Sequence, residues 1–290
     1  MKRIAIISLV VLGICVWSWG QDKPAAQNPP AGQAGQGASQ TAAPQGKRPP
    51  KINSQEEYAA YQAAVKVADA GECEKAANDF AAKYPASEVR TIVYKAAMLR
   101  YQQTNNEAKA VEIAKKVLAI DPDDPEALVA VALADVDLAK DDSLDKDERL
   151  TAAKKGAERS LVTVETDVPT TGYPEEQLKN YKNFIRSQAY FVIGMAAYKT
   201  SHWPEAEANL RKSIDALPQS PDVVTIYHLA LSLDFQNKIP EALKAAQQAV
   251  ELTKDTPDSP AGKAARQEQD RLMKYSTTGT SGQAGTPPKN

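Results

Sequence analysis

Residues 187–218, which read SQAYFVIGMAAYKTSHWPEAEANLRKSIDALP, determine the fold expected for this chain. Two stretches with helical spacing of apolar residues are separated by a polar turn that contains His202. Gly194 lies inside the first stretch, where a missing side chain lets a second helix approach closely. Large apolar residues on either side can fill the grooves between the helices. This stretch therefore predicts a pair of closely packed helices.

Related pairs recur along the chain. Three pairs of apolar residues are 34 positions apart: Ala76 and Ala110, Phe80 and Ala114, and Tyr94 and Leu128. A period of about 34 residues is the length of one helix–turn–helix repeat. A single pair cannot bury its own apolar faces, so neighbouring pairs are expected to stack and cover them. We expect this stack to extend over residues 53–275.

The starts of several helices are marked by capping signals. Ser54 and Glu57 form a capping box, in which each side chain can bond the backbone of the other residue. Asp124, Ser220 and Ser259 each precede a proline, and proline is favoured at the first position of a helix. These signals divide the region into helices of ordinary length.

The units resemble tetratricopeptide repeats (TPR), which carry small residues at positions 8 and 20 and large residues at several flanking positions. The units start at Glu57, Thr91, Pro125, Ser187 and Val223. Small residues at position 20 are Ala76, Ala110, Ala206 and Ala242. The resemblance implies an all-α superhelical solenoid of about five helix pairs followed by a C-terminal capping helix.

The middle unit departs from this pattern. Its second helix, which contains Ala153, comes about nine residues late, and the acidic stretch 140–147 forms the longer turn. Residues 163–173 are expected to be a non-helical loop, and Pro174 is expected to start a long helix. The insertion is interpreted either as a tolerated bulge or as a functional loop.

The N-terminus has the features of an export signal. A basic start is followed by an uncharged apolar run over residues 4–16, and Ser18 and Gly20 are small residues before a cleavage site at Gln21. Residues 1–20 are therefore predicted to be a signal peptide. The protein is expected to be exported, and to be periplasmic or associated with the cell envelope.

Two alternatives apply to this end of the chain. Residues 4–20 could stay uncleaved as an inner-membrane anchor, or Cys15 could be acylated in a partial lipobox. Residues 21–52 and 276–290 are rich in Gln, Ala, Gly, Ser, Thr or Pro. Such segments have too little apolar surface to fold, so we expect a disordered linker and a disordered tail.

Composition excludes several classes of function. The formal net charge is −2 and the sequence has no basic stripe, so nucleic acid is not an expected partner. The sequence contains two histidines and none of the common catalytic, nucleotide-binding or metal-binding motifs. We therefore expect a protein that is not an enzyme, with no cofactor and no metal site.

The TPR resemblance implies a concave groove lined by the first helix of each unit. The residues predicted to line it are aromatic, amide or basic: Tyr58, Tyr61, Lys95, Gln102, Gln103, Phe191, Tyr198, Lys199, Tyr227 and Phe235. Aromatic anchors with scattered polar groups suit an extended peptide or a partner helix. The alternative is that several of these rings pack between neighbouring units. The lysine and asparagine clamp of chaperone-binding TPR proteins is absent from the sequence.

One unit suggests a cellular setting. Residues 80–87, FAAKYPAS, resemble the end of repeats in periplasmic TPR proteins of outer-membrane assembly and of cell-division coordination. We expect a non-catalytic protein–protein interaction scaffold of the bacterial cell envelope. The alternative is an accessory subunit of an envelope enzyme or of a secretion or outer-membrane assembly complex. Membrane association would require an uncleaved signal or a membrane-bound partner.

The intact mass of the exported protein tests the predicted signal peptide. We expect the mass of a chain that begins at Gln21, because Ser18 and Gly20 fit the cleavage site. A mass that includes residues 1–20 would identify an anchor, and added acyl chains on Cys15 would identify a lipoprotein.

Overall fold

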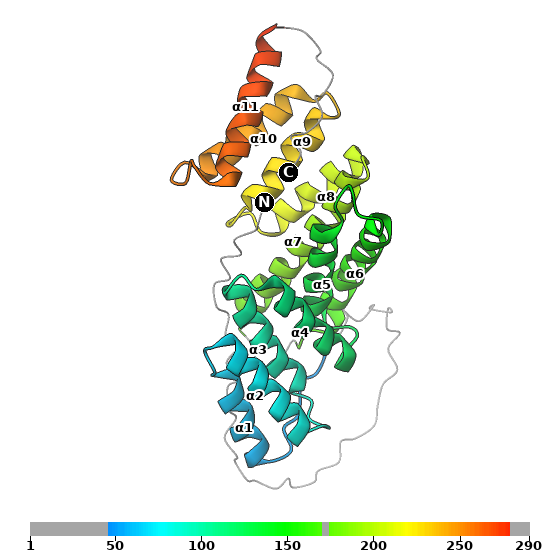
Figure 1. Ribbon diagram of the computed structural model, residues 1–290, viewed down its shortest axis with the longest axis vertical. Helices are drawn as coiled ribbons and strands as arrows, with labels where there is room; N and C mark the ends of the chain where they lie inside the picture. Colours follow the sequence, from blue (N-terminus) through cyan, green and yellow to red (C-terminus); the bar gives the residue numbers. More distant parts are fainter. Residues whose placement is uncertain (1–45, 170–173, 279–290) are drawn as a thin grey trace, which may run out of the picture.

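The computed structural model describes residues 46–169 and 174–278 (Figure 1). Within these ranges the regular structure is helical. In chain order the helices are α1 (Gln55–Val65), α2 (Ala70–Lys83), α3 (Arg90–Gln103), α4 (Glu107–Ile120), α5 (Pro125–Leu138), α6 (Lys146–Thr166), α7 (Glu175–Lys199), α8 (Trp203–Ala216), α9 (Val223–Asp234), α10 (Ile239–Leu252) and α11 (Pro260–Thr278). The prediction of an all-α protein is confirmed.

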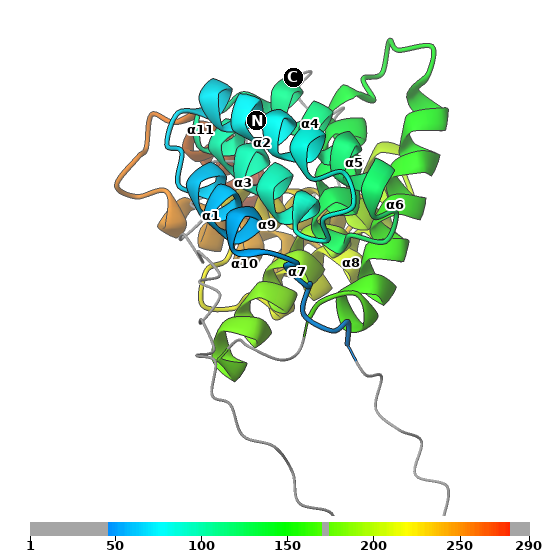
Figure 2. The ribbon, with the colours of Figure 1, turned by 90° about the horizontal axis from the view of Figure 1, so that it is seen from below.

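Each helix packs against the next helix in the chain, so the body is a stack with α1 at one end and α11 at the other (Figure 1). Seen from the α1 end, the later helices lie behind the first ones (Figure 2). Helices two apart in the chain also touch, such as α5 with α7 and α7 with α9. The helix order agrees with five successive pairs and one further helix.

The same tight turn joins the two helices of three pairs. Asn105, Ser201 and Asn237 have φ angles of 56°, 62° and 60°, in the left-handed region. Each is the fifteenth residue of its unit, counted from Thr91, Ser187 and Val223 respectively. The repeat positions derived from the sequence therefore coincide with a repeated backbone conformation.

Hydrogen bonds identify this turn as a Schellman motif. In each case the residue after the left-handed one donates its backbone N–H to the carbonyl oxygen five residues earlier. The three bonds are Asn106 to Tyr101 at 2.8 Å, His202 to Ala197 at 2.9 Å, and Lys238 to Leu233 at 3.0 Å. The turn caps the first helix and directs the chain back along it.

The first pair is shorter than the sequence predicts. Helix α2 begins at Ala70 because the side chain of Asp69 caps it, which is three residues earlier within its unit than α4 begins. Cys73 and Ala77 are 0% and 1% exposed, whereas Ala76 is only half-buried. The predicted equivalence of Ala76 with Ala110 is therefore wrong, and Cys73 occupies the matching place.

The insertion in the middle unit lies where the sequence predicts it, with α5 ending at Leu138 and α6 beginning at Lys146. The expected loop over residues 163–173 is too long at its start, because α6 continues to Thr166. Thr163 and Val164 are 6% and 0% exposed and extend the buried face of α6. Residues 170–173 lie outside the described residues.

The ends of the described chain bear on the predicted boundaries. Helix α11 continues to Thr278, so the first three residues of the predicted tail, 276–278, are helical. Residues 46–54 precede α1 without regular structure. The predicted signal peptide, Cys15 and residues 21–45 of the predicted linker lie outside the described residues. Among the helices that are described, none has both the length and the apolar character to cross a membrane.

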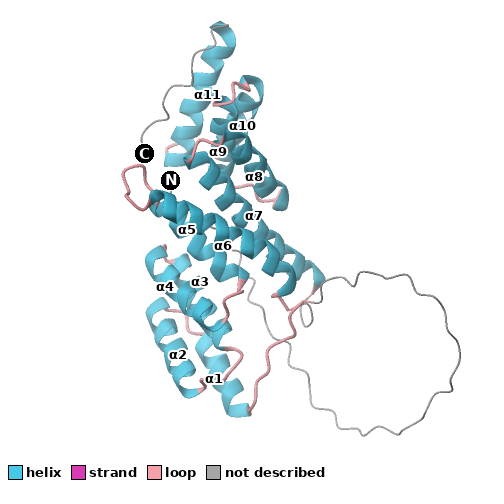
Figure 3. Ribbon diagram, turned by 90° about the vertical axis from the view of Figure 1, so that its right-hand side faces the viewer, coloured by secondary structure: helices cyan, strands magenta, loops and turns pink. Residues whose placement is uncertain are grey.

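Buried apolar residues form two clusters that meet at α5. The first cluster spans α1 to α4 and takes Ala127 and Ala130 from α5. The second takes Val129 and Ala132 from α5 and continues to α11. We call α1–α4 the N-terminal half and α5–α11 the C-terminal half; Figure 3 shows the two halves stacked. We call the boundary between the two halves, where α5 packs against the N-terminal half, the joint.

Helices α7 and α8 approach closely at Gly194. A Cβ atom at this position would lie 2.9 Å from Leu210 Cγ and 3.2 Å from the Leu210 backbone nitrogen. Gly156 on α6 offers a contrast, because a Cβ there would lie 3.5 Å from Ala132 Cβ, which is ordinary contact. The pair α7–α8 therefore requires glycine in a way that α5–α6 does not.

Replacing each of these glycines with alanine tests this contact. We expect Gly194→Ala to lower the free energy of unfolding by about 1–3 kcal/mol, because the added methyl overlaps Leu210. We expect Gly156→Ala to be neutral or stabilising by roughly 0.5–1 kcal/mol, because alanine favours helix and the added methyl makes only ordinary van der Waals contact. Urea unfolding of both variants measures the difference, and equal stabilities would contradict the close approach.

Candidate binding site: an aromatic cluster on α7 to α9

Three of the predicted groove residues, Tyr198, Tyr227 and Phe235, meet in the C-terminal half, with His228 between Tyr198 and Tyr227. Tyr198 and Lys199 form the end of α7, Tyr227 lies on α9, and Phe235 caps the end of α9. The left-handed residue Ser201 turns the chain after α7, which places Trp203 at the start of α8 beside them. The repeated turn thus positions the site.

We use the name aromatic cluster for the five rings of Tyr198, Trp203, Tyr227, His228 and Phe235. These rings contact each other in favourable geometries. Trp203 and Phe235 are stacked, with ring centroids 4.2 Å apart and an interplanar angle of 14°. Tyr198 meets Trp203 edge-on at 5.3 Å and His228 edge-on at 5.1 Å. Such pairs stabilise a structure by about 0.5–1.5 kcal/mol each beyond their buried area. The cluster ties α7, α8 and α9 together.

Burial divides the cluster into an inner and an outer part. Tyr227 and His228 are 5% and 8% exposed and belong to the interior. Tyr198, Trp203 and Phe235 are half-buried. Burial raises the pKa of Tyr227 to about 12 and raises the pKa of Tyr198 further. Both phenols therefore stay protonated at neutral pH and can donate hydrogen bonds.

Polar side chains hold the outer rings in place. The Gln236 amide donates to the Trp203 carbonyl oxygen at 3.3 Å and to Glu207 Oε2 at 2.9 Å. Lys238 and Arg211 also bond Glu207, at 2.6 Å and 3.0 Å. Although burial opposes it, these bonds lower the pKa of Glu207. Glu207 is therefore ionised, and its bonds to Gln236 and Lys238 join the start of α8 to the turn after α9.

Lys199 connects the cluster to the middle of the stack. Its Nζ donates to the Ala139 carbonyl oxygen at 2.9 Å, at the end of α5. Burial lowers the pKa of Lys199, and the nearby Asp137 and Asp141 only partly oppose this. The adjacent Leu138 is 53% exposed. The Lys199 ammonium and the exposed Leu138 thus both lie at the end of α5, which packs against α7.

Two of the three other predicted aromatic anchors are in the interior. Phe191 on α7 is 4% exposed and Tyr61 on α1 is 3% exposed. Tyr58 is half-buried, with its ring centroid 6.4 Å from that of Tyr61. Tyr61 and Tyr58 lie in the N-terminal half, at the opposite end of the stack from the aromatic cluster. Their part in binding stays a prediction.

Lys95, on α3, belongs to a partly buried network of charges. Its Nζ pairs with Asp124 at 3.0 Å and with Glu126 at 3.4 Å, and the Tyr181 hydroxyl donates to Glu126 at 2.9 Å. Although burial opposes it, the two carboxylates raise the pKa of Lys95 well above its usual range. Its charge is therefore already paired within the fold, which favours a structural role.

The two glutamines predicted for the groove lie at the end of α3. Gln102 is half-buried and Gln103 is exposed. Both belong to the N-terminal half, so the structure separates them from the aromatic cluster.

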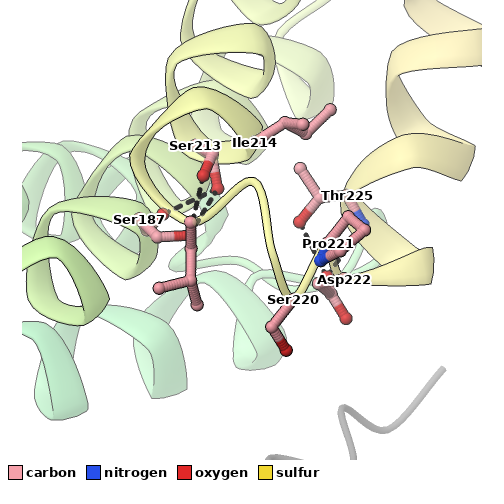
Figure 4. Close-up of a pocket in the computed structure, with 8 residues that line it drawn as sticks. Ser187, Ser213, Ile214, Ser220, Pro221, Asp222 and Thr225 are labelled. Atoms are coloured by element: carbon pink, nitrogen blue, oxygen red, sulfur yellow. Dashed lines mark hydrogen bonds between the residues drawn. The ribbon is translucent and has the colours of Figure 1, made fainter. Parts of the chain in front are cut away.

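A small hollow lies between α7, α8 and α9 (Figure 4). Its cavity volume is about 10 Å³, room for roughly one water molecule and far below the roughly 300–1,000 Å³ of most ligand sites. The Ser187 and Ser213 hydroxyls that face each other there lie 3.2 Å apart and also donate to backbone carbonyls. This hollow does not fit a small-molecule ligand, and its serines join α7 to α8.

The described residues contain no group of three His, Cys, Asp or Glu side chains placed to hold a metal ion. Cys73 is buried, and burial raises the pKa of its thiol. It packs in the core between α1 and α2 rather than facing a site.

Neither a protein-family model nor a curated protein sequence matches the chain.

The sequence analysis did not predict the stack of Trp203 on Phe235, which belongs to the next pair. Replacing Trp203 with alanine tests the stack. We expect a loss of about 2 kcal/mol in the free energy of unfolding, since a half-buried ring and its contacts disappear. Trp203→Phe should lose less than about 1 kcal/mol, because a ring still faces Phe235. Chemical denaturation measures both, and a wild-type stability for Trp203→Ala would contradict the contact.

Proposed function

We propose that this protein is an exported TPR-type scaffold that binds a protein partner without catalysing a reaction. Support for the repeat class comes from the recurring left-handed turns and from the small residues that face the partner helix. At position 20, Ala110, Ala206 and Ala242 are 4%, 0% and 0% exposed. These residues let the helix backbones approach, which is the packing that the TPR resemblance implies.

The observation that carries the binding function is the half-buried outer part of the aromatic cluster. Tyr198, Trp203 and Phe235 are held rigidly by stacking and by the Glu207 bonds, yet each keeps some exposed surface. Rigid aromatic rings of this kind are common anchors at protein interfaces, because they bury a large area with little loss of side-chain entropy.

The surroundings of the rings indicate the chemistry of the partner. Lys199 follows Tyr198 in the chain and supplies a cation, and Leu138, next to the Ala139 carbonyl that Lys199 bonds, is an exposed apolar side chain. We propose that the partner contributes an extended or helical segment with apolar side chains that cover the rings. The export signal expected at residues 1–20 supports an encounter in the bacterial cell envelope.

Site-specific photo-crosslinking in cells that produce the protein tests this proposal. A benzoylphenylalanine placed at Phe235 should crosslink to a discrete partner, because this ring lies in the proposed interface. Val162, which is 65% exposed on α6, gives a matched control position outside the cluster. We expect no partner adduct there.

A second substitution in the crosslinking chain tests whether the adduct depends on the aromatic cluster. Adding Trp203→Ala to the crosslinking chain should weaken the adduct at Phe235 at least several-fold, while circular dichroism confirms that the helices are intact. No adduct at Phe235, or equal adducts at Phe235 and Val162, would overturn the proposed binding site.

A further inference from the structure

A segment before the first helix runs along the side of the stack. Residues 46–54, which we call the N-terminal strap, extend from α1 to the region where α6 ends (Figure 3). Near α1 the strap is fixed to Glu88 in the turn between α2 and α3. The Arg48 guanidinium donates to both Glu88 oxygens, at 2.8 Å and 2.6 Å, and the Lys51 backbone N–H donates to Oε2 at 2.8 Å.

Further along, Lys47 joins the two halves of the molecule. Its Nζ donates to Asp121 Oδ2 at 2.5 Å and to Asp167 Oδ2 at 3.1 Å. Asp121 is the C-cap residue of α4, and Asp167 is the C-cap residue of α6. One ammonium group therefore holds the end of the N-terminal half against the C-terminal half.

Apolar packing across this joint is light. Helix α5 contributes Ala127 and Ala130 to the cluster of the N-terminal half, with Val131 packed against it. Alanine side chains bury little area, and apolar burial stabilises by only about 25 cal/mol per Å². Opening the joint therefore exposes less apolar surface than opening a helix pair such as α7–α8.

Charged contacts also cross the joint. Lys95 on α3 pairs with Asp124 and Glu126 at the start of α5. Lys47 spans Asp121 and Asp167 on the outside of the same region. The strength of a joint that depends on ion pairs changes with salt and with the charges of its side chains, whereas that of an apolar core does not.

We propose that the N-terminal strap is a pin, in which Lys47 fixes the angle between the two halves, and that the joint moves when this contact is lost. The consequence concerns partner access. Tyr58 lies in the N-terminal half and the aromatic cluster lies in the C-terminal half. The pin therefore sets whether one partner can span both.

The charges around the pin give it a dependence on pH. Lys47 faces two carboxylates, Asp121 and Asp167, while the nearby Asp123 is paired with Arg159 at 2.6 Å. Burial and the charge of Asp121 raise the pKa of Asp167 to about 6. Although burial opposes it, the bonds to both carboxylates raise the pKa of Lys47, so the ammonium keeps its charge through this range.

The direction of the effect follows from linkage. An exposed aspartate titrates near 3.9, so Asp167 binds a proton more readily in the closed form than it would after release into solvent. Closure is then favoured as pH falls below about 6. As pH rises through this value, Asp167 ionises in a partly buried place beside Asp121, and the cost of burying this charge next to a second carboxylate opposes closure, although the ion pair with Lys47 offsets part of that cost.

A distance measurement between the halves tests the pin. Spin labels at Asp79→Cys on α2 and Gln248→Cys on α10 are exposed, while Cys73 is buried. The full chain also carries Cys15→Ser, so that the labels report only these positions. We compare Lys47→Met with Lys51→Met, because the Lys51 contact uses the backbone N–H and survives the change.

We expect a narrow distance distribution at pH 5.5 for the parent chain and for Lys51→Met, and a broader or shifted one for Lys47→Met. In the parent chain the distribution should broaden between pH 5.5 and pH 7.5. Asp167→Asn, which keeps a neutral side chain, should stay narrow at both values. Circular dichroism verifies that every variant is folded.

Two results would overturn the inference. If Lys47→Met has the same distribution as the parent chain at pH 5.5, the strap does not fix the joint. If Asp167→Asn broadens with pH as the parent chain does, Asp167 is not the group that titrates. Neither result bears on the aromatic cluster, so the pin and the proposed binding function fail independently.

Discussion

The structure depends on how closely two helix backbones can approach within a pair. At Gly194 the approach is so close that a Cβ would overlap Leu210. In the other pairs, alanines such as Ala110 and Ala242 take the facing positions and are almost fully buried. Small residues lower the area that each side chain buries, so stability comes from many contacts of modest size. The large rings are then left for positions between pairs, where they form the aromatic cluster.

Much of the fold follows from short-range patterns. The period of 34 residues and the proline-marked starts predict the helix order, and the left-handed residues Asn105, Ser201 and Asn237 fall at one position of the predicted units. The predicted alignment of the first pair was wrong because the 34-residue period alone does not show that Asp69 caps α2 and starts it early. The end of α6 was misplaced because Thr163 reads as a loop residue but is buried here.

The candidate site was harder to predict, because its contacts join residues from different pairs. Positions 198 and 235 follow from the unit frame, but the stack of Trp203 on Phe235 depends on the rotation between two pairs. Which aromatic residues are interior, such as Phe191, depends on the same rotation. The contacts of Lys47 bridge 74 and 120 residues of sequence, and no local pattern indicates them.

The pairing of each helix with its neighbours in the chain also determines how the protein can fold. Contacts that are local in sequence cost little loop-closure entropy, and proteins rich in them fold quickly. A chain that emerges with its N-terminus first could assemble α1 to α4 before α11 has been made, since the first core cluster draws on little beyond α4. Completion of α5 and α6 would then supply Asp167, the last partner that Lys47 requires. The order of synthesis and the order of assembly can therefore be the same.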